Sequence, residues 1–203
     1  MWDVIFGKPN FFRSHISGTS SCSQILWINR FADDNGSICK ISVDGTDFHI
    51  QEPRPFDRKW FSHKFKGPGV RYEVGVCLQT GDIVWTNGPF QCGSYPDGKI
   101  ATEMGLDAAL DRGERYVCDG GYYGPRADKL NGLNNADQYM KQVARSRHET
   151  VNARFKQFGV LAQVFRHQPE KHGIVFNAVA IITQLCLMYD QPLFQIYYND
   201  RVY

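Results

Sequence analysis

Two runs of β-forming residues joined by a short link restrict the fold of this chain more than any other stretch. The first run, VRYEVGVCLQT, covers residues 70–80, and the second, DIVWTNG, covers residues 82–88. Their β-branched and aromatic residues favour strands, and the Gly81-Asp82 link is typical of a tight hairpin. The sequence therefore predicts two antiparallel strands that are adjacent in a β-sheet.

Further strands and helices are expected on both sides of this hairpin. A short apolar run at residues 38–41 predicts a strand that is closed by Asp44, and residues 115–124 predict another short strand. Helical patterns cover about residues 97–110, 135–158 and 170–188. Strands followed by interleaved helices around one sheet are typical of an α/β domain. We therefore expect an α/β fold with a mixed β-sheet flanked by α-helices.

Composition places broad limits on function. The hydrophobic content of 42% is ample for a packed core, and the net charge of +2 means that any nucleic-acid-binding surface must be local. The six cysteines form no Cys-x-x-Cys pair and several lie in apolar runs, which indicates a reducing, intracellular compartment. No signal-peptide pattern is present, and the longest apolar run, residues 174–188, is expected to be too short to cross a bilayer. These features predict a soluble protein without a membrane partner.

The stretch SVDGTD, residues 42–47, supports two interpretations. Asp-Gly is a common hairpin signal, and for this stretch taken alone a turn is the more frequent outcome. The alternative is that Asp44 ends a strand in order to hold a metal ion, with Gly45 allowing the chain to turn away sharply. The other acids of the chain decide between the two.

Three other acids fall at positions that favour a metal site. Asp97 enters the first predicted helix, Asp119 closes the strand at residues 115–124, and Glu149 lies within the next helix. If the first strand lies beside this later strand in parallel, Asp44 and Asp119 project at the edge where α/β sheets place their sites. Clustered carboxylates repel one another and are neutralised by a cation, and hard oxygen ligands suit Mg²⁺ or Mn²⁺. The four acids are therefore candidates for one metal-binding cluster.

The helix that carries Glu149 also supports two interpretations. Its apolar face consists of Met140, Ala144, Val151, Phe155 and Phe158, and the opposite face consists of Gln142, Arg145, Glu149, Asn152, Ala153 and Lys156. A solvated face with helical salt bridges is the more frequent outcome for a single Glu among cations. A functional face would instead place one carboxylate among cations that hold phosphates, and Arg147 and Arg154 widen this basic patch.

Six pieces of the sequence occur in a recognisable order over about residues 38–198: VDGTDFHI, WFSHKFKGPGVRYEVGV, GDIVWTNGPFQCGSYPD, CDGGYYG, RSRHETVNARFKQFGVL and FNAVAIITQLCLMYDQPLFQIYY. Together they resemble the catalytic domain of the DDE superfamily endonucleases, specifically the PIF/Harbinger-like transposases. The resemblance implies an RNase H-like fold and an enzyme that cuts and joins DNA strands with divalent metal ions.

The resemblance also implies site residues. It makes Asp44 the first acid, Asp97 the acid of a Gly-Ser-x-x-Asp motif, Asp119 that of an Asp-x-Gly-Tyr motif, and Glu149 the acid of the late helix. All four are assigned to catalysis and to two Mg²⁺ or Mn²⁺ ions, and either Asp97 or Asp119 is the second acid of the triad. The implied substrate is DNA. Candidate phosphate contacts are Lys64, Lys66, Arg71, Arg145, Arg147 and Lys156.

The expected domain organisation is an irregular N-terminal segment at residues 1–37, the endonuclease domain at 38–198 and a tail at 199–203. Transposases of this group usually carry DNA-binding regions before the catalytic core. We therefore expect a fragment, a chain that relies on a separate DNA-binding partner protein, or a decayed or repurposed copy. The alternative function is a domesticated, non-catalytic module that binds DNA or protein on the same fold. The resemblance implies a location in the nucleus, and the histidines lack zinc-ligand spacing.

Overall fold

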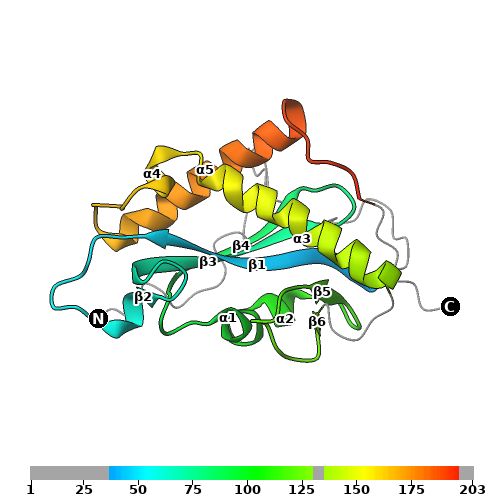
Figure 1. The fold of residues 1–203 in the computed structure, drawn as a ribbon, viewed down its shortest axis with the longest axis horizontal. Helices are drawn as coiled ribbons and strands as arrows, with labels where there is room; N and C mark the ends of the chain where they lie inside the picture. Colours follow the sequence, from blue (N-terminus) through cyan, green and yellow to red (C-terminus); the bar gives the residue numbers. More distant parts are fainter. Residues whose placement is uncertain (1–36, 130–134, 197–203) are drawn as a thin grey trace, which may run out of the picture.

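The computed structural model describes residues 37–129 and 135–196, which form a mixed β-sheet with helices on both faces (Figure 1). The strands are β1 (Cys39–His49), β2 (Phe61–Ser62), β3 (Gly67–Cys77), β4 (Ile83–Gln91), β5 (Arg115–Val117) and β6 (Ala127–Asp128). The helices are the 3₁₀ turn η1 (Arg58–Trp60), α1 (Asp97–Glu103), α2 (Leu106–Ala109), α3 (Asn135–Phe155), α4 (Gly159–Ala162) and α5 (Pro169–Tyr189). Helices α3, α4 and α5 cover one face of the sheet, and α1 and α2 cover the other (Figure 1). The predicted α/β fold class is confirmed.

The order of strands in the sheet is β2-β3-β1-β5-β6, and β4 also pairs with β3. Strands β3 and β4 are antiparallel neighbours, which confirms the predicted hairpin. Gly81 in the link has a φ of +83°, a conformation that glycine adopts without steric cost. Strand β1 is parallel to β5, so the predicted adjacency of the first strand and the later strand is also confirmed.

Strand β1 is longer than the sequence predicts. It runs through Asp44 as far as His49, with Asp44 opposite Val74 and Asp47 opposite Arg71 on β3. The stretch SVDGTD is therefore neither a hairpin turn nor the tip of a strand, and both predictions were wrong. Pairing with β3 over the whole length of β1 outweighs the local turn preference of Asp-Gly, as tertiary context commonly does in strands.

The alternation of side chains along β1 and β3 separates two hydrophobic cores. Residues such as Phe48, Val70 and Tyr72 pack against α3 and α5, whereas Ile41 and Val43 pack on the side of α1 and α2. Because both faces are covered, every residue of β3 from position 69 to 77 is buried. A strand buried on both faces is normally apolar throughout, so the charged residues Arg71 and Glu73 of β3 stand out.

Several predicted elements end earlier than expected. The helix predicted at residues 97–110 is divided into α1 and α2 at Gly105, whose φ of +111° cannot continue a helix. Helix α3 ends at Phe155 rather than at residue 158, and β5 ends at Val117. The early end of β5 releases Asp119 from the sheet into the loop that follows it.

Helix α5 is 21 residues long and, by length and composition alone, apolar enough to cross a membrane. The expectation that this run is too short was therefore wrong. Its residues Phe176, Val179 and Ala180 are nevertheless buried in the hydrophobic core beside β3 and α3. A helix that buries one face in this way is typical of a globular core, and the same test of length and composition accepts such helices.

Candidate functional site

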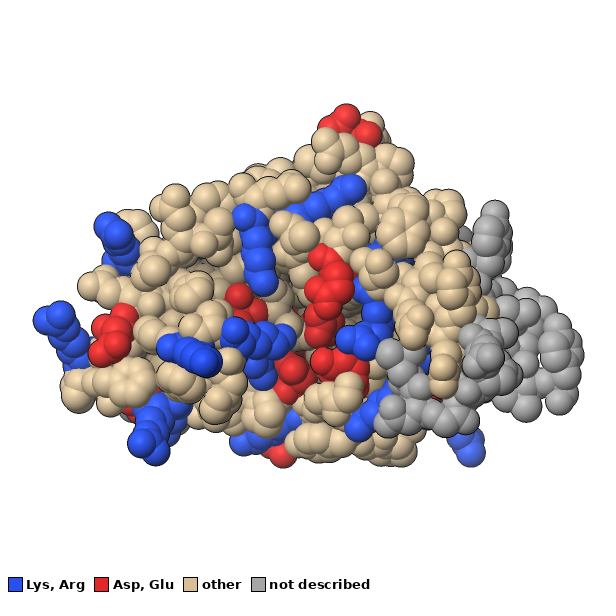
Figure 2. Space-filling model, viewed as in Figure 1, with Lys and Arg blue, Asp and Glu red and all other residues tan. Residues whose placement is uncertain are grey.

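Three of the four predicted acids line one small pocket on the α3 side of the sheet. Asp44 comes from β1, Asp119 follows β5, and Glu149 comes from α3. We call this the acid pocket, which is lined by Ser42, Val43, Asp44, Asp119, Arg145, His148 and Glu149. Figure 2 shows acidic side chains gathered near the middle of the molecular surface that it draws, with Lys and Arg side chains around them. The fold thus brings together acids that are far apart in the sequence.

The register of the parallel strands explains why Asp119 lies near Asp44. Ser42 of β1 is paired with Val117 of β5, so each acid follows its paired residue by two positions. Residues two apart in a strand lie on the same face, and the loop after β5 continues in the same direction. The two carboxylates therefore lie just beyond the end of β5, where its pairing with β1 stops.

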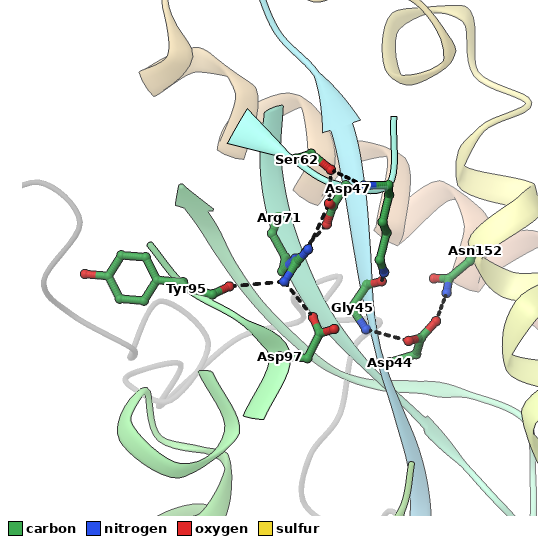
Figure 3. Close-up of polar contacts among 9 residues, drawn as sticks. Asp44, Gly45, Asp47, Ser62, Arg71, Tyr95, Asp97 and Asn152 are labelled. Atoms are coloured by element: carbon green, nitrogen blue, oxygen red, sulfur yellow. Dashed lines mark hydrogen bonds and ion pairs between the residues drawn. The ribbon is translucent and has the colours of Figure 1, made fainter. Parts of the chain in front are cut away.

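Two hydrogen bonds orient the carboxylate of Asp44 (Figure 3). The backbone N–H of Gly45 donates to Oδ1 at 2.8 Å, and Asn152 Nδ2 on α3 donates to Oδ2 at 2.9 Å. Burial raises the pKa of Asp44, the charge of Lys64 opposes this increase, and the charge of Asp119 adds to it. Asp44 is therefore held in a fixed direction but carries an electrostatic cost that a bound cation would relieve.

His148 forms part of the wall of the acid pocket. Its Nδ1 lies 2.9 Å from the hydroxyl oxygen of Ser42, and its ring is buried. Burial lowers the pKa of His148 to about 4, so the imidazole is neutral at pH 7. It contributes a packed, uncharged surface beside Glu149 rather than a positive charge.

Asp97 lies on the other side of β1 from the side chain of Asp44 (Figure 3). Its Oδ1 is 3.2 Å from Arg71 Nη1, and a Cβ added to Gly45 would lie only 2.0 Å from this same oxygen. A Cβ added to Gly121 would lie 3.4 Å from Asp97 Oδ2 and 3.1 Å from Asp119 Oδ1. Asp97 is therefore not among the residues that line the acid pocket, but it lies between β1 and the loop that carries Asp119.

Arg71 holds two acids at once. Its Nε and Nη2 donate to the two carboxylate oxygens of Asp47 at 2.7 and 2.9 Å, while Nη1 reaches Asp97 and donates to the backbone oxygen of Tyr95 at 3.2 Å (Figure 3). Ser62 Oγ donates to Asp47 Oδ2 at 2.5 Å. Burial alone would raise the pKa of Asp47, but Arg71, together with Ser62 and Lys64, holds it below its ordinary value. We call Asp47, Arg71 and Asp97 the Arg71 clamp.

The structure places the six predicted phosphate contacts in different environments. Lys64 Nζ donates to the backbone oxygen of Gly45, and Arg145 lines the acid pocket. Lys66 and Lys156 are exposed. Arg71 is held inside its clamp. Arg147 is 1% exposed, and its Nη2 donates to the backbone oxygens of Cys77 and Leu78 at 2.6 and 2.7 Å. The two buried arginines thus present no guanidinium to a phosphate at the surface.

The acid pocket has the donor chemistry that a hard divalent cation prefers. Three carboxylates from three separate elements line it, and carboxylate oxygens are the ligands of Mg²⁺ and Mn²⁺. Among residues 37–129 and 135–196, no three His, Cys, Asp or Glu side chains lie close enough together to hold a metal ion as they stand. Mutual repulsion favours such a spread arrangement of carboxylates. The three side chains are of the type that binds a divalent metal ion. To coordinate one ion together, their carboxylates would have to move closer to one another.

The polar partners of the acids were not predicted from the sequence. Asn152 was assigned only to the face of Glu149, although its position three residues later in the same helix is a usable signal for a shared site. Asp47 was not singled out as the partner of Arg71, nor Ser62 as a donor to Asp47. The second acid of SVDGTD was visible in the sequence, but only the pairing of Asp47 with Arg71 across β1 and β3 shows what it does.

Comparisons with known proteins yield one match. A family model described as DDE superfamily endonuclease matches residues 43–184, which is well over half of the chain. The matched region begins one residue before Asp44 and includes all four predicted acids. No curated protein and no solved structure matches the chain.

Proposed function

Because the chain belongs to the DDE superfamily endonuclease family, we propose that it is a divalent-metal-dependent DNA endonuclease of the transposase type. The proposed reaction is cleavage of a phosphodiester by water, with a later attack by a DNA 3′-hydroxyl that joins strands. Such displacements need no nucleophile from the protein. The work of the chain is to bind DNA, to orient the reacting groups and to hold the metal ions.

The observation that carries this proposal is the convergence of Asp44, Asp119 and Glu149 on the acid pocket. We assign these three as the acids that hold the metal, and Asp119 rather than Asp97 as the second acid of the triad. They come from β1, the loop after β5 and α3, so only the folded chain forms the set. Within residues 37–129 and 135–196 none of the three forms an ion pair, whereas the structural acid Asp47 pairs directly with Arg71.

The surroundings of the three acids suit this role. Asn152 and the backbone N–H of Gly45 fix the direction of the Asp44 carboxylate. When bound there, divalent ions would stabilise the charge that develops on the phosphate and lower the pKa of the attacking water. Neutral His148 leaves the negative charge of the pocket intact, so that the acids retain their attraction for cations.

DNA is proposed to lie across the face that carries the acid pocket. Lys64 and Arg145 flank the acids, and Lys66 and Lys156 extend the exposed positive charge. Contacts of this kind to the backbone give affinity that falls with salt and little preference for sequence. Selection of particular DNA ends would then depend on a separate DNA-binding partner protein.

Two finer assignments complete the proposal. The order of the six sequence pieces supports membership of the PIF/Harbinger-like group within the family. An enzyme that acts on genomic DNA would work in the nucleus. Both rest on the resemblance of the sequence rather than on the geometry of the site.

The test is cleavage of supercoiled plasmid DNA with Mn²⁺ or Mg²⁺, with and without a chelator. Wild type is compared with Asp44→Ala, Asp119→Ala and Glu149→Ala, and the matched control is Glu103→Ala, an exposed acid at the end of α1. We expect metal-dependent nicking by wild type and the control, and none by the three pocket variants.

Two results would contradict the proposal. If wild type does not nick DNA and calorimetry detects no Mn²⁺ binding, the acid pocket is not a working metal site. The non-catalytic binding module would then be the better account, and DNA binding by wild type without any cleavage would support it directly. If nicking persists in all three pocket variants, the activity belongs to another site or to a contaminant.

A further inference from the structure

The side chain of Asp97 lies against residues that neighbour two of the pocket acids, Asp44 and Asp119. On one side its Oδ1 lies so close to Gly45 that a Cβ there would be 2.0 Å away, and Gly45 directly follows Asp44. On the other side its Oδ2 faces Gly121, as does Asp119 Oδ1. The carboxylate of Asp97 therefore fills the space between the strand of Asp44 and the loop of Asp119.

The residue after Asp97 makes a second contact with the same loop. A Cβ added to Gly98 would lie 2.2 Å from the ring of Tyr123, so this ring rests directly on the first turn of α1. Within the loop, the backbone N–H of Gly121 donates to Asp119 Oδ1 at 2.8 Å. The position of the first turn of α1 thus determines where the loop lies and, through it, where Asp119 lies.

Arg71 connects that first turn to β1. Its guanidinium is attached to Asp47 of β1 by two hydrogen bonds, and from this fixed position it contacts Asp97 and the backbone oxygen of Tyr95 just before α1. The side chains of Arg71 and Asp47 are 9% and 1% exposed, so the ion pair is poorly screened by water. Bidentate pairs between arginine and carboxylate are also geometrically rigid.

We propose that Arg71 is a positioning residue, which holds Asp97 between Gly45 and the Asp119 loop and thereby sets the spacing of Asp44 and Asp119 across the acid pocket. Arg71 acts through Asp97, and neither residue contacts the metal. The inference rests on the proposed function, because the spacing matters for a ligand that both pocket acids share. It gives the Arg71 clamp a role beyond the anchoring of α1.

The first test measures Mn²⁺ affinity by calorimetry, with the melting temperature of each full-length variant. Arg71→Lys and Asp97→Ala should each weaken Mn²⁺ binding roughly tenfold, as is common when partners of metal ligands are lost. The double variant should bind Mn²⁺ no more weakly than either single variant. Asp97→Asn should keep most of the affinity, because its amide has nearly the shape of the carboxylate and its oxygen can occupy the position of Oδ1 beside Arg71 Nη1.

The matched control is Lys141→Gln. Lys141 is 4% exposed and donates to Asp128 Oδ1 at 2.6 Å, a buried ion pair that includes no residue of the acid pocket. Its removal should lower the melting temperature without changing Mn²⁺ affinity. If Arg71→Lys behaves like this control, Arg71 is merely structural and the inference is wrong. If Asp97→Asn loses as much affinity as Asp97→Ala, Asp97 binds the ion directly and the inference is also wrong.

A second measurement does not depend on metal. Hydrogen–deuterium exchange should be faster in residues 119–123 of Arg71→Lys and Asp97→Ala than in wild type, and unchanged there in Lys141→Gln. Unchanged exchange in both clamp variants would overturn the inference even if wild type bound no Mn²⁺. Conversely, faster exchange together with a wild type that binds Mn²⁺ but does not nick DNA would remove the proposed function and leave the positioning role intact.

Discussion

Asp44 and Asp47 lie three residues apart on one strand, yet the pKa values of their carboxyl groups shift in opposite directions. Asp44 is half-buried in the acid pocket, where burial and the charge of Asp119 raise its pKa. Asp47 is buried in the Arg71 clamp, where hydrogen bonds from Arg71 and Ser62 outweigh burial and lower its pKa. The clamp supplies a partner for each charge, as a structural ion pair requires, whereas the pocket gathers like charges, which is typical of a site that awaits a ligand.

The largest expected effect would come from loss of a pocket acid. Glu149→Ala should lower the rate of plasmid nicking more than a thousandfold, about 4 kcal/mol in activation free energy, because a proposed metal ligand is lost. Its melting temperature should stay within a few degrees of wild type, because Glu149 is exposed. A large drop in melting temperature would show that the acid pocket, like the clamp, is structural.

Loss of the clamp cation should lower stability as well as Mn²⁺ affinity. Arg71→Gln should lower the free energy of unfolding by about 3 kcal/mol or more, because Asp47 is left buried without a counter-charge. Urea unfolding measures this, and Arg71→Gln combined with Asp47→Asn should recover part of the loss. If Arg71→Gln were as stable as wild type, water would replace the guanidinium in the folded variant. The electrostatic difference between the Arg71 clamp and the acid pocket would then be small.

Glu73 is a buried acid on the clamp side whose described partner is neutral, since Trp85 Nε1 donates to its Oε2 at 2.9 Å, and its pKa extends the comparison to pH. Burial, with the charges of Asp97 and Asp107, raises its pKa to about 8, from 4.5 in the unfolded chain. The folded protein therefore keeps a proton that the unfolded chain releases between these values, and this contribution to stability is lost as pH rises through the window. Relative to Glu73→Gln, wild type should lose roughly 2 kcal/mol of unfolding free energy from pH 5 to 7.

Urea unfolding of both proteins at pH 5, 6 and 7 measures this difference. Parallel stability profiles of wild type and Glu73→Gln would show that the Glu73 carboxyl is ionised in the folded state. The folded protein would then stabilise the charge of Glu73, as it stabilises the charge of Asp47.

A single methyl group added at Gly45, next to Asp97, should have a moderate effect on both stability and Mn²⁺ affinity. The added methyl group of Gly45→Ala would overlap Asp97 Oδ1, so Asp97 must move or β1 must shift, at a cost of about 1–2 kcal/mol in unfolding free energy. Thermal melts and Mn²⁺ calorimetry measure the two consequences. Gly159→Ala, where an added Cβ meets no atom within 4 Å, is the control.

The smallest effect is expected at an exposed lysine outside both regions. Lys66→Ala should weaken DNA binding modestly and reduce the slope of log affinity against log salt concentration by about 1, because one proposed phosphate contact is lost. Fluorescence anisotropy at several salt concentrations measures the slope. Arg147→Lys, which changes a buried residue, should leave the slope unchanged.

Local patterns in the sequence determined most of the elements of this fold. Alternating β-formers gave the β3–β4 hairpin, apolar periodicity gave α3 and α5, and acids near predicted strand ends identified Asp44 and Asp119 as candidates. These signals are local because each depends on the residues of one segment. The interruption of the first helix at Gly105 is also local in origin, although glycine alone did not reveal it.

Tertiary structure alone decided how far β1 extends and which acids lie together. Pairing with β3 carried the strand through Asp-Gly, and the two-residue alternation of the strand then placed Asp44 on the α3 side and Gly45 and Asp47 on the other. Likewise, Arg71 and Arg145 are the same residue type in the sequence, but one is enclosed by the sheet and the other opens on the acid pocket. Burial and pairing depend on segments far away in the chain, which no local pattern encodes.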